Sequence, residues 1–276
     1  MRKGLLDPKV DFVFKNIFGS PKHPEILISF LNATLKPRNN IVSVAIKKTD
    51  IEKQYIEDKY SRLDVKATTS NDEIINIEIQ LKNENNMIKR SLYYLSKMYE
   101  EQLNEKEDYS KLARTVCINI LNFKYLKTDK FHTGYRFKEI ETNEELTDVM
   151  EVHFIEIPKL NDNRDEKDML VAWTEFLKDP ESEKVRGLEL SVDEIRQAKD
   201  ELIRMSNDKK QRELYDMRAN SLRDKISELN AAEKKGREEG RKEEKIEIAR
   251  NMKLNKIDIN TICRITWLTE EDIEKL

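Results

Sequence analysis

The chain has 276 residues, is 38% hydrophobic and 38% charged, and carries a formal net charge of −3. This length accommodates one sizeable domain with an appendage, and the charge gives no overall sign of a nucleic-acid partner. No segment approaches the roughly 20 apolar residues of a membrane span, and the N-terminus lacks the apolar run of a secretory signal. The two cysteines form no CxxC unit and the three histidines have no metal-ligand spacing, so we expect a reduced, cytoplasmic protein without structural zinc.

The charge is uneven along the chain. Residues 1–48 contain nine lysines and arginines against three acidic residues, a balance of +6. Such a bias can steer a polyanion towards one part of the surface. A solvated helix face remains the simpler interpretation of any single lysine.

Two helices and a strand are predicted first. Asp7-Pro8 is typical of a helix N-cap followed by proline at the first helical position, and Gly19 is typical of a helix end. A second helix is expected over residues 24–35. Residues 41–46 (IVSVAI) are short and β-branched, which predicts a buried or half-buried strand.

Residues 61–82 predict a β-hairpin, because two alternating runs flank a Ser-Asn-Asp turn. In the second run four apolar side chains point one way and four polar ones the other. The apolar set is Ile75, Ile77, Ile79 and Leu81; the polar set is Asn76, Glu78, Gln80 and Lys82.

The next segments predict a helix over about 86–104, a strand over 115–123 and two further strands over 134–140 and 148–157. The predicted order gives an α/β core with a mixed β-sheet flanked by helices. We expect this core domain to cover residues 1–160.

Residues 161–276 are expected to form a helical C-terminal region. Within it, residues 233–247 contain six basic and six acidic side chains at helix-supporting spacing, which predicts a charged helix over 233–250. The 251–276 tail predicts short helices, the last capped by Thr269 with Asp272. These helices have a weak helix-turn-helix character, but packing or self-association is favoured because no clustered basic recognition helix accompanies them.

The hairpin suggests a metal site. With Asn71 at the middle of the turn, Asp64 faces Glu78 across the two strands, and such carboxylates repel unless a cation lies between them. Gln80 on the same face is placed to orient a water, and Lys82 to stabilise developing negative charge. An ordinary polar outer face of a half-buried hairpin is the competing interpretation.

The motifs LDV around Asp64 and IEIQ around Glu78 and Gln80 resemble those of the PD-(D/E)XK nuclease superfamily. More closely, the chain resembles the recombination-promoting nuclease (Rpn) or transposase family. The resemblance extends to the segments DFVFKNIFG (11–19) and DKYSRLDVKA (58–67), to the stretch from Arg90 to ILNF, and to the GREEGRKEE and ITWLTEEDIEKL segments.

This resemblance implies a restriction-endonuclease-like fold and a DNA endonuclease that uses Mg²⁺ or another divalent cation such as Mn²⁺. It assigns the metal to Asp64 and Glu78, with Asp11 as a candidate third acidic residue, and implies roles in DNA recombination, transposition or defence against foreign DNA. Lys15 is a candidate phosphate contact. A homodimer is expected, since cutting both strands needs two sites.

One departure from the wider superfamily concerns position 80, where glutamine replaces the usual lysine. Glutamine cannot act as a base, so Lys82 or Lys66 substitutes, or solvent or the substrate phosphate deprotonates the attacking water. The alternative is a catalytically degenerate module that binds DNA or protein, and a third interpretation is a structural oligomerisation protein.

The predicted helix after the motif carries a further candidate nucleic-acid contact. Arg90 and Tyr94 lie four residues apart, so they share a face that is suited to charge and stacking contacts with nucleic acid. Packing of tyrosines against the sheet is the competing interpretation, and it is favoured for at least one of Tyr93, Tyr94 and Tyr99.

Overall fold

The computed structural model describes residues 4–47, 65–161 and 168–276. The chain divides into two compact units, Met1–Arg218 and Ala219–Leu276. The first unit therefore extends well past the boundary that the sequence predicted at residue 160.

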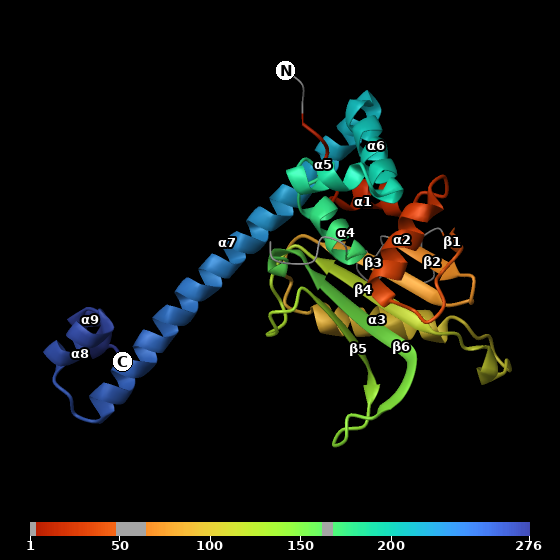
Figure 1. Cartoon of the computed structure of the whole chain (residues 1–276). Helices are drawn as coiled ribbons and strands as arrows, with labels where there is room; N and C mark the ends of the chain where they lie inside the picture. Colours follow the sequence, from red (N-terminus) through yellow and green to blue (C-terminus); the bar gives the residue numbers. More distant parts are fainter. Residues whose placement is uncertain (1–3, 48–64, 162–167) are drawn as a thin grey trace. The chain divides into compact units, whose positions relative to one another are not determined.

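The first unit is built on a mixed six-stranded sheet with the strand order β1-β2-β3-β4-β6-β5 (Figure 1). Strands β3, β4 and β6 run parallel to one another, whereas β1, β2 and β5 pair antiparallel with their neighbours. The strands are β1 (Val44–Lys47), β2 (Val65–Thr69), β3 (Ile74–Gln80), β4 (Thr115–Leu121), β5 (His132–Lys138) and β6 (Glu145–Glu156). This is the predicted restriction-endonuclease-like α/β arrangement.

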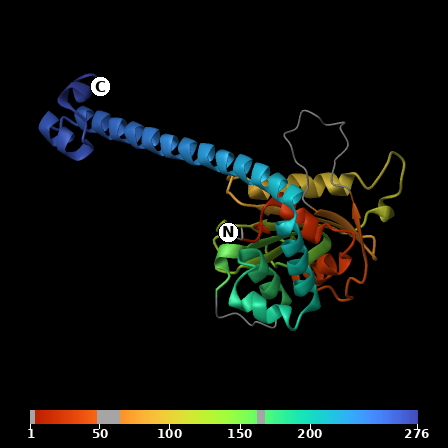
Figure 2. The same cartoon turned by 90° about the horizontal axis from the view of Figure 1, so that it is seen from above.

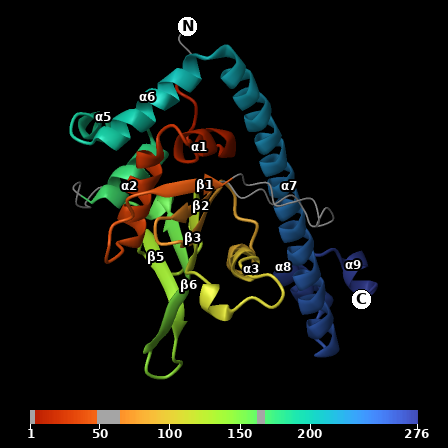
Figure 3. The same cartoon turned by 90° about the vertical axis from the view of Figure 1, so that its right-hand side faces the viewer.

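Helices cover both faces of the sheet. The helices of this unit are α1 (Asp11–Phe18), α2 (Pro24–Leu35), α3 (Met87–Glu100), α4 (Met169–Lys178), α5 (Glu183–Glu189) and α6 (Asp193–Asn207), with 3₁₀ turns η2 (Tyr109–Lys111) and η3 (Ile157–Lys159). The main core joins α1, α2 and α4–α6 to one face, and a second cluster joins α3 to the other. Figure 3 shows α3 on the opposite side of the sheet from α1 and α2.

Helices α4–α6 belong to the main core because their apolar faces pack against the N-terminal helices (Figure 2). Trp173 of α4 is fully buried, with ring contacts to Phe18 of α1 and to Phe176. Its indole N–H donates to the Ser29 hydroxyl of α2. Residues far apart in sequence thus complete one core, which explains why the first unit continues beyond residue 160.

The predicted starts of two elements are wrong for local reasons. Helix α1 begins at Asp11 rather than at Pro8, because the Asp7 carboxylate accepts a hydrogen bond from the backbone N–H of Lys9 in a turn that precedes the helix. Strand β1 begins at Val44 rather than at Ile41, because the Ile41 backbone N–H and C=O both bond the side-chain amide of Asn32. The predicted helix end at Gly19 is confirmed: its N–H donates to the Lys15 carbonyl.

The remaining element bounds also differ from the predictions. The helix predicted over 86–104 is α3, which ends at Glu100, and the strand predicted over 115–123 is β4, which ends at Leu121. The strand predicted over 134–140 is β5, which begins and ends two residues earlier, and the strand predicted over 148–157 is β6, which begins earlier and is longer. The helix predicted over 24–35 has the expected bounds. The expected α/β order is therefore correct although the ends of elements shift.

The second unit contains most of α7 (Lys209–Leu254), together with α8 (Ile259–Thr266) and α9 (Glu270–Glu274). The predicted charged helix over 233–250 is part of α7, and its side chains are almost all exposed. A small cluster around Ala249, Ile262 and Ile273 holds the three helices together. The predicted Thr269–Asp272 capping box is present at α9. Within the described parts of the chain, no helix has the length and apolar character needed to cross a membrane.

Candidate active site

The β2–β3 hairpin has the register that the sequence predicted. Val65 lies opposite Ile77 and Lys66 opposite Asn76, and this register continues to Thr68 and Ile74. Asp64 lies outside the described residues, so its pairing with Glu78 stays a prediction. The observed register therefore bears only on the part of the predicted site that lies on β3.

The polar face of β3 is buried. Asn76 is 0% exposed to solvent and Glu78 is 2% exposed. They are buried because β3 lies between β2 and β4 and α3 covers this face of the sheet. The interpretation of this face as an ordinary solvated hairpin surface is wrong for both residues. A buried carboxylate is costly unless it is paired or coordinates a metal, which marks Glu78 as a functional candidate.

The Glu78 carboxylate has loose contacts. Its Oε1 lies 3.5 Å from the Asn76 amide nitrogen, and its Oε2 lies 3.4 Å from Nη2 of Arg90. Oε2 has no hydrogen-bond partner within the described segments. Burial raises the pKa of Glu78, and the charge of Arg90 and the Asn76 amide oppose that rise. Among the described residues, the site thus contains a buried acid whose contacts, with Asn76 and Arg90, are both long.

Two buried asparagines line the same face, and the sequence analysis did not assign them to the site. The Oδ1 of Asn76 has no hydrogen-bond partner among the described residues. Asn119 lies opposite Glu78 on β4, accepts a hydrogen bond from the Ser91 hydroxyl and donates one to the His153 carbonyl. The available signal for Asn119 was a single amide within an otherwise apolar strand.

Arg90 lies at this site on the first turn of α3. Besides Glu78, its guanidinium lies 4.0 Å from Glu84 and 5.6 Å from the centre of the Tyr94 ring. Tyr94 is buried against the sheet, as favoured for at least one tyrosine, while Tyr93 is half exposed. The structure therefore brings the predicted nucleic-acid contact and the predicted metal ligand Glu78 together.

Asp11 and Lys15 lie on α1, which covers the opposite face of the sheet from α3. The half-exposed Asp11 carboxylate forms a 3.0 Å ion pair with Arg218. Among the described contacts none joins Asp11 to Glu78. Lys15 is exposed on the same helix. Their predicted roles at the metal and at phosphate stay predictions.

Gln80 and Lys82 lie at the C-terminal end of β3, whereas Lys66 lies opposite Asn76 near the start of that strand. The Gln80 side chain is half buried. Its backbone carbonyl accepts a hydrogen bond from the backbone N–H of Asn122. Lys82 follows the strand and is half exposed. Lys66 shares the sheet face of Asn76, as cross-strand partners do, and its ammonium lies 3.6 Å from Glu101.

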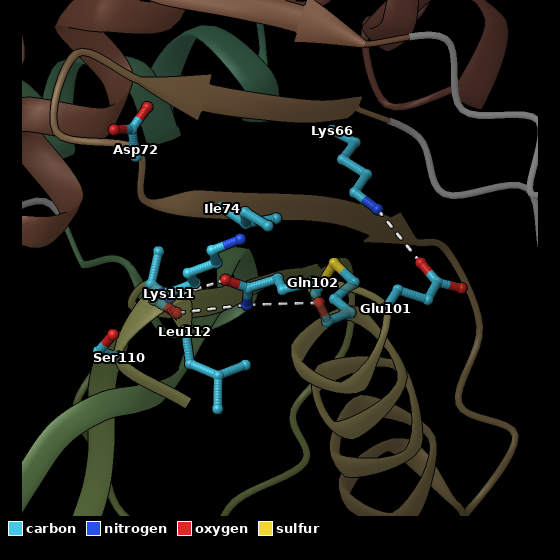
Figure 4. A pocket seen from close by; sticks show the side chains of 10 residues that line it. Lys66, Asp72, Ile74, Glu101, Gln102, Ser110, Lys111 and Leu112 are labelled. Carbon is cyan, nitrogen blue, oxygen red and sulfur yellow. Dashed lines mark hydrogen bonds and ion pairs between the residues drawn. The ribbon is translucent and has the colours of Figure 1, made fainter. Parts of the chain in front are cut away.

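Lys66 also lines an open pocket of about 700 Å³ between the hairpin and the C-terminal end of α3 (Figure 4). The pocket contains Lys111 as a second cation but also Asp72 and Glu101, so its charges balance. It therefore gives no anion-binding preference of its own.

The described residues on β3 offer two oxygen atoms as candidate ligands for a cation. No group of three or more histidine, cysteine, aspartate or glutamate side chains forms one within the described ranges. Glu78 Oε2 and Asn76 Oδ1, which have no hydrogen-bond partner among the described residues, are however hard oxygen donors of the kind that Mg²⁺ and Mn²⁺ accept. The residues present on β3 fit a divalent cation.

Comparison with known protein families decides the affiliation. Residues 8–232 match the model described as PD-(D/E)XK nuclease family transposase. The chain belongs to this family. The PD-(D/E)XK match covers the sheet, the helices of the first unit and the start of the second unit, in agreement with the resemblance found in the sequence.

A second match concerns the tail. Residues 242–276 match the model of the Rpn/YhgA-like nuclease family, C-terminal HTH domain. This match favours the helix-turn-helix interpretation of the tail over the packing or self-association that the sequence analysis preferred. No curated protein and no solved structure matches the PD-(D/E)XK chain.

Proposed function

We propose that this PD-(D/E)XK protein is a DNA endonuclease in which Asp64 and Glu78 hold a divalent cation, Mg²⁺ or Mn²⁺. The observation that carries the proposal is the buried Glu78 carboxylate, one oxygen of which has no hydrogen-bond partner among the described residues, on the strand of the family motif. Burial of such a group lowers the stability of the fold, and a bound cation removes this destabilisation.

The bound cation supplies polarisation of the scissile phosphate and a lowered pKa of an attacking water. Glu78 contributes a carboxylate that lies buried between the sheet and α3, and the Asn76 amide nitrogen lies 3.5 Å from its Oε1. Asn76 Oδ1, which accepts no hydrogen bond from a described residue, adds a neutral oxygen donor on the same strand face. Burial excludes bulk water, which strengthens each of these electrostatic contacts.

Gln80 cannot supply the positive charge that lysine provides in the motif of the wider superfamily. Its amide orients a water or the phosphate, while Lys66 on β2 and Lys82 after β3 are the nearby cations in sequence and sheet position. Lys66 has the stronger case, because it shares the sheet face of Asn76. In this proposal Lys66 stabilises the charge that develops on the phosphate.

The wider setting follows from the family. We place the protein in the cytoplasm as a homodimer that acts on DNA in recombination, transposition or defence against foreign DNA. The C-terminal helix-turn-helix contacts the same DNA, and Lys15 of α1 adds a phosphate contact.

A second candidate is a DNA-binding module that no longer cleaves. Gln80 favours it, because the motif lysine is absent. The two candidates differ in a single observable, which is cleavage at a site that binds metal.

The test is cleavage of supercoiled DNA by the purified full chain in Mg²⁺, in Mn²⁺ and in EDTA. Asp64→Asn and Glu78→Gln keep the side-chain shape but weaken a cation ligand, and Glu105→Gln removes an exposed acid as the matched control. We expect metal-dependent nicking that falls at least about 100-fold in the two site variants and is unchanged in the control. Equal nicking by all four proteins contradicts the proposal, and DNA binding without nicking supports the second candidate.

A further inference from the structure

The guanidinium of Arg90 lies between two carboxylates of very different exposure. Glu78 is 3% exposed at its side chain and Glu84 is 29% exposed, while Arg90 itself is 25% exposed. The nearer of the two is the buried Glu78, at 3.4 Å against 4.0 Å. Arg90 therefore has an inner partner beneath α3 and an outer partner towards solvent.

The inner contact is not a closed ion pair. Arginine–carboxylate pairs that serve stability form two parallel hydrogen bonds at about 2.7–2.9 Å. Here one nitrogen lies at 3.4 Å, Glu78 Oε2 accepts no hydrogen bond from a described residue, and the buried Nε of Arg90 has no partner among them either. Charge attraction holds the guanidinium near Glu78 without locking its geometry.

A divalent cation at Glu78 conflicts with this position. A metal ion and a guanidinium on the same buried carboxylate repel each other at short range and low dielectric. The guanidinium carbon of Arg90 lies 5.6 Å from the centre of the Tyr94 ring, and the guanidinium has Glu84 on its outer side at 4.0 Å. The Tyr94 ring and the Glu84 carboxylate are thus two further partners for the guanidinium when it moves away from Glu78.

We propose that Arg90 is the internal cation of Glu78, that the metal displaces it, and that the displaced guanidinium binds a phosphate of the DNA. This inference rests on the proposed metal site. Arginine suits both positions, because its planar group pairs with carboxylate and with phosphate. Arg90 then lowers the affinity for metal in free protein and raises the affinity for DNA once the metal is bound.

The two binding events become coupled through one side chain. DNA removes Arg90 from competition at Glu78, so it favours metal binding, and by linkage the metal favours DNA binding to the same extent. Arg90 is a positioning residue in this scheme, and its removal has effects of opposite sign on the two ligands.

The experiment compares the full-length wild type with Arg90→Gln, with Arg90→Lys and with Lys89→Gln, which removes the charge of an exposed neighbour on α3. Mn²⁺ binding is measured at pH 8 by electron paramagnetic resonance without DNA. We expect Arg90→Gln to bind Mn²⁺ about tenfold more tightly than the wild type, Arg90→Lys to lie between them, and Lys89→Gln to match the wild type.

Binding of a short DNA duplex is measured in Ca²⁺ and in EDTA, with intact duplex verified afterwards. We expect Arg90→Gln to bind the DNA about fivefold more weakly than the wild type in Ca²⁺. The difference should be smaller in EDTA, because without a metal ion Arg90 of the wild type stays at Glu78. Thermal unfolding with and without Mn²⁺ provides a folding control: Arg90→Gln gains more stability from the ion than the wild type does.

The Glu78→Gln variant distinguishes failure of the proposed metal site from failure of the role proposed for Arg90. If Mn²⁺ binding is independent of Glu78, the proposed metal site and this inference are both overturned. If Mn²⁺ binding needs Glu78 but Arg90→Gln binds Mn²⁺ no more tightly than the wild type, the role of Arg90 alone is overturned.

Discussion

His132 and His153 stack across β5 and β6, with ring planes 13° apart and 2.9 Å between Nε2 of His132 and Nδ1 of His153. The other His153 nitrogen bonds Glu151, which also pairs with Arg114 and Arg136. A buried polar chain thus ties the edge strand β5 to β6.

This chain predicts a pH dependence of stability. Burial and the neighbouring His153 lower the pKa of His132 to about 4, from 6.5. A depressed histidine pKa means that the unfolded chain binds more protons between these values, so stability falls as pH drops from about 6.5 to about 4. The loss amounts to as much as about 3 kcal/mol.

Urea unfolding of the wild type and of His132→Asn from pH 7.5 to pH 4 tests this. We expect the difference in unfolding free energy between the two proteins to shrink towards the acid end. A difference independent of pH would show that His132 does not titrate as described. Glu151, whose pKa lies at about 2 because of His153 and Arg114, contributes mainly below this window.

Replacement by alanine is expected to have opposite effects on stability at two glycines. A Cβ at Gly19 would lie 2.6 Å from the Lys15 carbonyl oxygen, so Gly19→Ala forces the backbone apart at the end of α1 and costs about 1–3 kcal/mol. Gly236 lies within α7 with open space around it, so Gly236→Ala stabilises that helix by up to about 1 kcal/mol. Circular dichroism during thermal unfolding measures both, and a stabilising Gly19→Ala would contradict the contact.

Truncation tests where the first unit ends. A chain that stops at residue 160 lacks Trp173, Phe176 and α6, whose side chains fill the main core, whereas a chain that stops at residue 218 retains them. We expect the longer piece to unfold cooperatively and the shorter one to show no cooperative transition. Cooperative unfolding of residues 1–160 would instead support the boundary predicted from sequence.

The two cysteines differ in accessibility. Burial, together with the nearby Glu78 charge, raises the pKa of Cys117 to about 12, and its thiol has no exposure to reagent. Cys263 in α8 is partly exposed. Brief treatment with iodoacetamide followed by peptide mass spectrometry should label Cys263 well before Cys117, because only the thiolate reacts. Early labelling of Cys117 would mean that α3 opens readily from the sheet.

Patterns close in sequence predicted much of the fold. The alternation in residues 74–80 and the Ser-Asn-Asp turn predicted β3 and the hairpin register, since a strand has a period of two and a tight turn sets the pairing. The glycine at position 19 predicted the end of α1 for a similarly local reason. The motif residues around Glu78 and Gln80 predicted the family, which residues 8–232 confirm.

Tertiary structure decided which of these residues are buried and what they contact. The same alternating pattern describes a solvated hairpin and a central strand, and only the packing of α3 and β4 buries Asn76 and Glu78. The approach of Arg90 to Glu78, and the entry of Trp173 into the core of α1 and α2, likewise join residues that no local pattern connects. Sequence alone thus determined local geometry and motif, whereas desolvation, which raises the pKa of Glu78, arises only when distant elements pack together.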